Sequence, residues 1–391
     1  MPSQTSLPQE LVDMSVDHLH DDIPALKHCS LVCRDWVPGA SHHLFAVFEW
    51  PPRSIGPGDI GTEGEECFRQ LVDILSAAPR IAHAVHELLL HSRNSLSIFL
   101  TPRTMVSLVD LLPNLRELSS LGCKLRPDSH QAADSAHTRT IQSLEFIGAS
   151  IFDHLPHFLR PFRRIQTLAI RGYNRVSPHD HNVSDAPPVF SGSLAVENIE
   201  LERCCFSCEM LSDLNGLVNF AAVRRLELES PPTGDAAPFI RAMHGLELLT
   251  YQISPTDVRP DLGLAHLPAV QIACYLRPST SSPGGDSGWF SLMRHLELFV
   301  GPHMRELGVK LLFTRDVATV SDADLESWLS GLDWGQLARH AERCPALTTL
   351  SIGLGRALSA YFTMSPGRYH RIVRAVAEEK LPKTLMDKVK I

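Results

Sequence analysis

The hexapeptide VRRLEL, from Val223 to Leu228, sets three apolar residues at fixed positions with charged residues between them. The order is an apolar residue, two others, an apolar residue, one other and a third apolar residue. Successive side chains of a β-strand point to opposite faces, so Leu226 and Leu228 are expected on one face and Glu227 on the other. The hexapeptide therefore predicts a strand that is buried on one face, and its recurrence along the chain would predict a repeat architecture.

The same pattern recurs on both sides of VRRLEL. The matching triplets are Val85/Leu88/Leu90, Ile141/Leu144/Phe146, Ile165/Leu168/Ile170, Val196/Ile199/Leu201, Leu246/Leu249/Tyr251, Leu267/Val270/Ile272, Met293/Leu296/Leu298 and Leu347/Leu350/Ile352, while Leu115/Leu118 has Ser120 in the third place. From position 88 to position 296, neighbouring middle residues are separated by 21 residues (249 to 270) to 31 residues (168 to 199). Segments such as Cys67–Ala77 and Arg103–Leu112 are expected to be the helices that return the chain between strands.

This pattern resembles a leucine-rich-repeat array, in which each repeat contributes one short strand. Cys123 and Cys204 stand at the position where that family has Asn or Cys, whereas Ala149 and Pro231 occupy it in other repeats. The resemblance implies an α/β fold, an irregular solenoid with short parallel strands and helices. Each repeat would bury its apolar face against its neighbours, so the array is expected to form one curved, cooperative unit.

The C-terminal part of the array departs from the regular pattern. Two alternating apolar runs flank Gly301-Pro302 and predict a hairpin or closely spaced strands. A helix is expected at Asp322–Ala341, a last strand near Leu347–Ile352 and a terminal capping helix at Arg371–Glu379. Three inserts rich in Ser, Pro, Gly, Asp or His are expected to be flexible loops, at Arg126–Thr138, Ser177–Ser193 and Arg277–Gly288.

The N-terminal residues have the periodicity of helices. Leu7-Pro8-Gln9-Glu10-Leu11 resembles a helix start, where proline is well tolerated. Two apolar stripes follow it, one made of Leu11, Met14 and His18 and the other of Val12, Val16 and Leu19. Together they are broader than one core contact needs, which predicts that the helix is covered from two directions.

A second helix is expected after the break at Asp21-Asp22-Ile23-Pro24. It contains HCSLVCRDW, from His28 to Trp36, in which Cys29, Val32, Cys33 and Trp36 fall at the spacing of one helix face. Because both cysteines share that face with the tryptophan, the spacing favours core packing over a metal site. Leu31 is expected on the opposite, exposed side of the helix.

Three N-terminal segments together resemble the F-box, and their residue pattern is especially similar to the F-box sequences of mushroom-forming fungi. They are LPQELVDMSVDHL (7–19), ALKHCSLVCRDW (25–36) and HHLF (42–45). The resemblance implies a helical module that docks on the Skp adaptor of a cullin–RING ubiquitin ligase, with Cys29 and Cys33 more inward. The residues matched to adaptor contacts are Leu7, Pro8, Leu11, Met14, Leu31, Val32 and Trp36; Met14-Ser15 departs from the commoner Ile-Phe pair. The predicted organisation is an F-box-like module (1–48), a Gly- and Pro-rich linker (49–66), the repeat array (67–355) and a helical cap (356–391).

Composition narrows the function classes. The formal net charge of −8 disfavours nonspecific nucleic-acid binding, which depends on basic patches. Residues 1–13 carry acids and no apolar run, so we expect no secretory leader. No apolar run is long enough to span a bilayer and the nine cysteines are thinly spread, so we expect reduced thiols in the cytoplasm or nucleus. We expect neither a metal nor a cofactor, because Cys204-Cys205-x-x-Cys208 lacks a second ligand pair and His179-Asp180-His181 lies in a polar insert. Gly285-Asp286-Ser287-Gly288 resembles the serine turn of trypsin-like proteases but has no matching histidine motif, so an enzyme is not expected.

One charged surface is predicted on the array. Residues between the apolar positions of a strand point away from the core, which places Glu200, Glu202, Glu227 and Glu229 on adjacent strands, with Glu145 and Glu297 further along. Two readings stay open, a solvated face partly neutralised by Arg171, Arg203 and Arg225, or a patch that selects a basic segment of a client protein. The resemblance thus implies a non-enzymatic substrate receptor that links a client to an SCF-type ubiquitin ligase. The alternative is an interaction scaffold outside any ligase.

Overall fold

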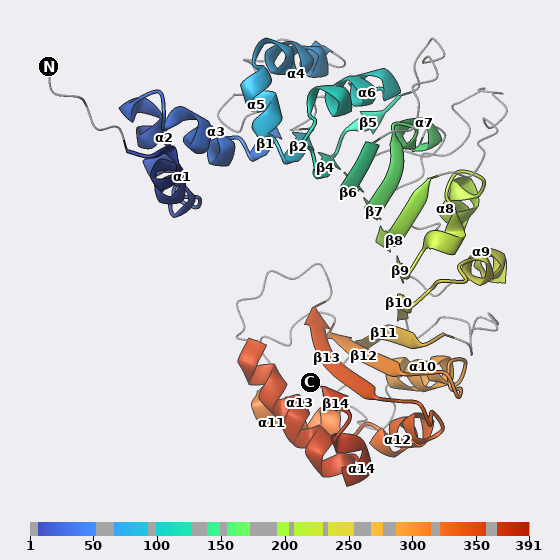
Figure 1. The fold of residues 1–391 in the computed structure, drawn as a ribbon. Coiled ribbons are helices and arrows are strands. Elements are labelled where there is room, and N and C mark those ends of the chain that lie inside the picture. Colours follow the sequence, from blue (N-terminus) through green and yellow to red (C-terminus); the bar gives the residue numbers. More distant parts are fainter. Residues whose placement is uncertain are drawn as a thin grey trace, which may run out of the picture. The chain divides into compact units, whose positions relative to one another are not determined.

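The computed structural model describes residues 7–51, 66–92, 99–126, 139–148, 155–172, 194–202, 207–229, 234–253, 267–276, 287–313, 321–356 and 366–390. The chain divides into two compact units, Met1–Ala195 and Val196–Ile391. Each unit consists of helices and parallel strands that follow one another in chain order (Figure 1). The two units are described separately below.

The first unit begins with a three-helix module, α1 (Gln9–Asp17), α2 (Ile23–Val32) and α3 (Val37–Leu44). The predicted first helix start is confirmed, with Pro8 at the N-cap of α1. The predicted break is also confirmed, because Asp22 caps α2 by accepting a hydrogen bond of 2.9 Å from the Ala25 amide. An Asp side chain at this position satisfies an amide that has no partner within the helix.

Five parallel strands complete the main sheet of the first unit, paired in the order β1, β2, β4, β6, β7. They span Val47–Trp50, Glu87–His91, Glu117–Leu121, Arg139–Ile147 and Phe162–Arg171. The helices between them are α4 (Glu66–Ala77), α5 (Pro79–Ala84), α6 (Pro102–Leu111) and α7 (Leu155–Leu159). A separate pair of short strands, β3 (Phe99–Leu100) and β5 (Lys124–Leu125), is also parallel. The helices predicted at Cys67–Ala77 and Arg103–Leu112 are therefore confirmed.

The second unit holds the strands β8 to β14, which pair in chain order and are all parallel. They span Ala195–Glu202, Arg225–Leu228, Leu248–Ile253, Ala269–Leu276, Glu306–Phe313, Thr349–Arg356 and Val389–Lys390. The α-helices are α8 (Ser207–Leu214), α9 (Ala237–Ala242), α10 (Ser287–Leu296), α11 (Asp322–Ser330), α12 (Trp334–Glu342), α13 (Pro366–Lys380) and α14 (Lys383–Met386). Short 3₁₀ turns lie at Phe220–Ala222 and Gly234–Ala236. The expected terminal helix at Arg371–Glu379 lies within α13.

The repeated apolar triplets form the core of both units. In the second unit the middle residues stack in register from strand to strand, with Ile199 beside Leu226, Leu226 beside Leu249 and Leu249 beside Val270. All three residues of the VRRLEL triplet are buried, and the intervening Glu227 is exposed. The polar Ser120 is buried at the third position of its repeat as well. The predicted α/β class, with parallel strands separated by helices, is confirmed.

The prediction for residues 293–311 is wrong. Met293 and Leu296 lie on α10, and the strand of that repeat is β12. Met304, just before β12, and Leu307 and Val309 within it have the triplet spacing and are buried. Strand β12 pairs in parallel with β11 and β13, so residues 296–311 form no hairpin. The physical reason is that Trp289, Leu292, Met293 and Leu296 also have helical spacing, and burial on the helix outweighs the short alternation that follows.

Other boundaries differ from prediction. The helix expected at Asp322–Ala341 is two helices, because Asp333 accepts a 2.9 Å hydrogen bond from the Gln336 amide and starts α12 anew. Strand β1 begins at Val47, ahead of the predicted linker at 49–66, and Glu66 already belongs to α4. The segment predicted as a helical cap also contains β14, which pairs with β13. Most of the three predicted inserts lies outside the described residues, but Ser287 and Gly288 begin α10.

Two strands are each followed by a glycine with a positive φ angle. Gly122 follows β4 and Gly148 follows β6, with φ angles of 69° and 64°. The Gly122 amide donates a 2.7 Å hydrogen bond to the Ile147 carbonyl, and the Gly148 amide donates one of 2.8 Å to the Arg171 carbonyl. Positive φ is strained for residues with a Cβ, so these glycines let each strand bond its neighbour as the chain turns away.

Cys123 occupies the repeat position that was expected from the leucine-rich-repeat resemblance. It is buried, and its thiol lies 3.8 Å from the carbonyl oxygens of Leu90 and Leu121, the first on the neighbouring strand. Burial raises the pKa of the Cys123 thiol to about 11, so this cysteine is neutral and structural at neutral pH. Cys204 lies outside the described residues. Among the described helices we find none that combines the length and the apolar character needed to cross a bilayer.

Candidate protein-interaction surfaces

The three-helix module has a small core of its own. Val12, Val16 and Leu26 are buried and contact one another. Three partly buried residues pack against them, Leu19, Trp36 and Leu44. The stripe of Val12, Val16 and Leu19 that was predicted on the first helix therefore faces the core. Such a core uses only part of the apolar surface that the module carries.

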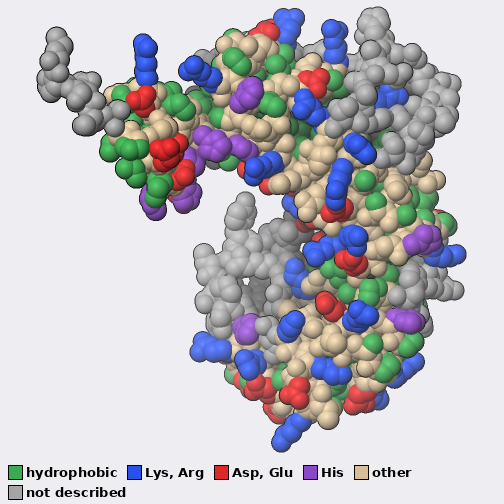
Figure 2. All heavy atoms as spheres, viewed as in Figure 1, with side chains coloured by type: hydrophobic (Ala, Val, Ile, Leu, Met, Phe, Trp, Pro, Cys, Tyr) green, Lys and Arg blue, Asp and Glu red, His purple; other side chains and the backbone are tan. Residues whose placement is uncertain are grey.

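The remaining apolar side chains of α1 and α2 are exposed. Of the ten large apolar residues that are exposed in the described part of the chain, six come from this module: Leu7, Leu11, Met14, Ile23, Leu31 and Val32. Figure 2 shows hydrophobic side chains gathered on the module. Monomeric proteins rarely leave such a concentration uncovered, and it is typical of a protein-interaction site. Five of the seven residues predicted to bind the adaptor belong to this set, which we call the apolar face.

The second helix is shorter than its sequence pattern predicted, and part of its predicted buried face is wrong. Helix α2 ends at Val32, and Cys33 is extended (φ −161°, ψ 173°). Consequently Val32 is 65% exposed and Cys33 is exposed, while Cys29 is buried as predicted. Pro38 lacks the N–H that would bond the Arg34 carbonyl in one continuous helix, and it lies instead in the first turn of α3, where proline is tolerated. Leu31 is 82% exposed, as its position opposite Cys29 predicted.

Pro8 and Trp36, the other two predicted adaptor contacts, differ in exposure. Pro8 is exposed beside the start of α1, next to the apolar face in sequence. Trp36 is only partly exposed, because its ring packs on the module core. The structure therefore brings Pro8 to the same helix end as Leu7 and Leu11, but gives Trp36 a role in holding the helices together.

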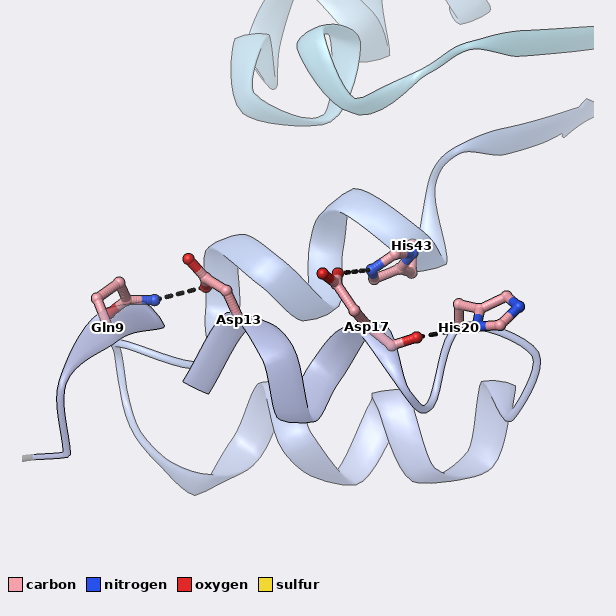
Figure 3. Close-up of polar contacts among 5 residues, drawn as sticks. All are labelled: Gln9, Asp13, Asp17, His20 and His43. Atoms are coloured by element: carbon pink, nitrogen blue, oxygen red, sulfur yellow. Dashed lines mark hydrogen bonds and ion pairs between the residues drawn. The ribbon is translucent and has the colours of Figure 1, made fainter. Parts of the chain in front are cut away.

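Polar contacts fasten α1 to the rest of the module (Figure 3). The Asp17 carboxylate lies 2.8 Å from Nε2 of His43 on α3, and His20 Nδ1 lies 2.8 Å from the Asp17 carbonyl oxygen. At the other end of α1, Gln9 donates 2.8 Å to the Asp13 carboxylate and 3.1 Å to the Asp35 carbonyl. These contacts involve both ends of α1, so the position of the apolar face is set by polar contacts as well as by the small core.

The predicted acidic residues lie on neighbouring strands. Glu200 on β8 is directly beside Glu227 on β9, and the Glu229 amide donates a 3.0 Å hydrogen bond to the Leu201 carbonyl. Glu200, Glu202 and Glu229 are partly exposed and Glu227 is exposed. Each of the four also has an interaction within the protein. The strand placement is confirmed for Glu200, Glu202 and Glu227, whereas Glu229 lies one residue beyond β9; we call these four residues the acidic patch.

Two glutamates do not extend the acidic patch. Glu145 belongs to the first unit, where its carboxylate lies 2.7 Å from Arg171 and accepts a 3.0 Å hydrogen bond from Ser119. The predicted neutralisation by Arg171 is thus observed for Glu145. Glu297 lies in the turn after α10, so its predicted strand position is wrong. Arg203, another predicted partner, lies outside the described residues.

In the part of the chain that the structure describes, no group of three or more His, Cys, Asp and Glu side chains could hold a metal ion. Cys204, Cys205, His179 and His181 lie outside that part, as do Gly285 and Asp286, whereas Ser287 begins α10 and Cys208 belongs to α8. Tyr251 and His295 make a buried contact of 3.2 Å between hydroxyl and Nδ1, and Phe299 lies against the same tyrosine ring, so the pair belongs to the core.

Comparison with known proteins returned neither a matching family model nor a matching curated protein. Any functional assignment therefore depends on the residues and surfaces described above.

Proposed function

We propose that the protein is the substrate-recognition subunit of an SCF-type cullin–RING ubiquitin ligase. The observation that carries the proposal is the apolar face, which sits on a helical module with a separate core. The resemblance of residues 7–45 to the F-box implies that this face binds the Skp adaptor. The adaptor would in turn link the protein to a cullin. The work of such a protein is to raise the local concentration of a client near the ligase, so it needs no catalytic residues.

The energetics of the apolar face suit a docking role. Covering one exposed Leu, Val or Met side chain completely contributes about 1.5–3 kcal/mol. Leu31, Met14 and Leu11 are three such side chains on two helices. Even after the cost of association, a few covered residues of this kind suffice for specific binding. Leu31 is the most exposed of them, and we assign it the central position in the adaptor interface.

The proposal also requires a surface that binds a client protein, and we assign it to strands of the second unit. The acidic patch on β8 and β9 would select a basic segment of the client, because complementary charge favours the right partner and its approach. The proposed location is the cytoplasm or nucleus, where adaptor and cullin would be met.

Adaptor binding tests the proposal directly. We expect Leu31→Asp combined with Met14→Asp to weaken binding to the purified Skp adaptor at least 100-fold, because a buried carboxylate without a partner is costly. Ile74→Asp is the matched control: it places the same charge at another exposed apolar position of a helix, α4, and should leave the affinity unchanged. Calorimetry of the full chain measures the affinity, and circular dichroism checks that each variant is folded. If the unaltered chain does not bind the adaptor, the protein is not a ligase receptor.

Charge reversal tests the acidic patch. We expect Glu200→Lys with Glu227→Lys to abolish capture of the client while adaptor binding persists, because the two residues face each other across β8 and β9. Proximity labelling with the full chain, compared with a chain lacking residues 1–48, identifies the candidate clients first. Glu342→Lys on α12, exposed and away from these strands, serves as the charge control. Capture that survives the double reversal would remove the patch from the client site.

An interaction scaffold outside any ligase is the second candidate, and the same apolar face supports it. On that reading another partner covers Leu31 and Met14. A chain that binds no adaptor yet labels the same neighbours with and without a cullin would favour the scaffold.

A further inference from the structure

Four histidines of the first unit lie close together where the three-helix module meets the strands. The ring of His42 lies 5.0 Å from that of His86 and 5.2 Å from that of His43, between ring centroids. His20 continues the series at 6.4 Å from His43. Figure 2 shows histidine side chains gathered beside the module. His42 and His43 belong to α3, whereas His86 lies in the turn between α5 and β2, so the contact joins two parts of the fold.

The junction has two sides with different kinds of contact. On the strand side, the Ala46 carbonyl accepts hydrogen bonds of 2.9 Å from the amides of His86 and Glu87. These backbone bonds belong to the start of the β1–β2 pairing and do not titrate. On the helix side, α3 packs against α5, and the His42–His86 contact lies edge to face, with an angle of 84° between rings. The strand side also carries ionisable groups, Glu87 and Glu117, whereas the helix side places two histidine rings in direct contact.

The charged neighbours of His42 come from every element around it. His86 faces it from the α5–β2 turn, His43 from its own helix, Asp17 from α1, and Arg116 from the segment before β4. Desolvation of the ring, then the neighbouring His86 and His43, and lastly Arg116 lower the pKa of His42, and Asp17 alone among these groups opposes them. Asp17 is itself engaged, because its carboxylate lies 2.8 Å from His43 (Figure 3).

We propose that the contact between His42 and His86 is a pH-sensitive hinge, which holds the three-helix module against α5 while His42 is neutral and releases it when His42 is protonated. The ring of His42 lies 5.0 Å from that of His86 and also near Arg116, and both neighbours disfavour a positive charge on His42. Acid would thus loosen the module from the strands, while the apolar core of Val12, Val16 and Leu26, which does not titrate, still holds the three helices together. The hinge does not depend on the proposed adaptor and stands whichever partner the module binds.

The direction of the effect follows from proton linkage. A histidine whose pKa is lower in the closed state than in the open state binds more protons in the open state. Closure is then fully favoured above the ordinary histidine pKa of about 6.5 and is progressively lost as the pH falls below it. Each unit by which the pKa is lowered changes the closing equilibrium about tenfold at low pH.

Hydrogen exchange of the full chain tests the hinge. We compare amide protection at pH 7.5 and pH 5.5, corrected for the intrinsic exchange rate, in Val37–Leu44 and Pro79–Ala84. Protection of these two helices should be lower at pH 5.5 than at pH 7.5, while β4 and β6 keep theirs. The variant His42→Gln with His86→Gln should lose this pH dependence. His28→Gln is the matched control, because His28 is an exposed histidine of the module on α2 and should leave the dependence intact.

Two results would overturn the hinge. One is a wild-type junction that is equally protected at both pH values. The other is a double variant, or the single variant His42→Gln if the double one fails to fold, that keeps the full pH dependence. Either result leaves adaptor binding at pH 7.5 untouched, so the failure of the hinge is separable from failure of the proposed ligase function.

Discussion

Leu26→Ala unfolds the three-helix module, whereas Leu31→Ala, on the same helix, leaves it folded. Leu26 is fully buried and is one of three buried residues in the module core, with Val12 and Val16. Removing a buried Leu side chain to Cβ costs about 2–5 kcal/mol, and a core this small has few neighbours that can close the cavity. A loss of that size is comparable with the whole stability expected of a module this small.

The comparison uses one residue type in two environments. Leu31 is 82% exposed, so its truncation removes little that contributes to folding. Hydrogen exchange of residues 9–44 in the full chain should show loss of protection in all three helices for Leu26→Ala and none for Leu31→Ala. Adaptor binding should fall in both variants, through unfolding in the first and through lost contact in the second. If Leu26→Ala keeps its protection, α1–α3 are stabilised mainly by the strands and not by their own core.

Leu249→Ala destabilises the second unit by about 2–5 kcal/mol, and Leu248→Ala, one position earlier, by less than about 1 kcal/mol. Leu249 is fully buried on β10 and lies in register with Leu226 on β9 and Val270 on β11. Leu248 is partly exposed on the opposite face of the same strand. Since each repeat buries its apolar face against its neighbours, a cavity at Leu249 weakens two interfaces at once.

Urea unfolding of the full chain, followed by hydrogen exchange in β9, β10 and β11, measures this effect. Protection should drop together in the three strands for Leu249→Ala, while the helices α1–α3 of the first unit keep theirs. An equal effect of the two substitutions would mean that the side-chain alternation has been assigned to the wrong faces. An effect confined to β10 would mean that the strands do not unfold as one cooperative unit.

The separation of these two cores has a functional consequence. Substitutions on the apolar face, such as Leu31→Asp, can remove partner binding without disturbing the strands. Substitutions in the acidic patch can change client selection without disturbing the module. The His42–His86 contact lies between the module and the strands of the first unit, which is where a change of pH could alter one without unfolding either.

Much of the fold was open to prediction because it depends on local periodicity. Apolar residues two positions apart specify which strand face is buried, and Leu226 and Leu228 of VRRLEL have this spacing. Helix boundaries were predictable where a cap or proline marks them, as at Asp22 and Pro8. The same reasoning was wrong at Met293 and Leu296, because a short apolar run satisfies the strand period and the helix period alike. There the choice was made by packing: Met293 and Leu296 are buried on α10, and Leu307 and Val309 are buried on β12.

The candidate surfaces likewise depend partly on local periodicity and partly on packing between elements. The sequence by itself determined that α1 and α2 carry more apolar residues than one small core can use, and that glutamates alternate with leucines on β8 and β9. Only the tertiary structure decided which of those apolar residues are covered: Val12 and Leu26 meet in the core, whereas Val32, the last residue of α2, and Cys33, just beyond it, are exposed. Only the tertiary structure brought His42 to His86, since no periodic pattern relates residues from different elements. Periodicity acts within one helix or strand, but contacts between elements depend on how the whole chain packs.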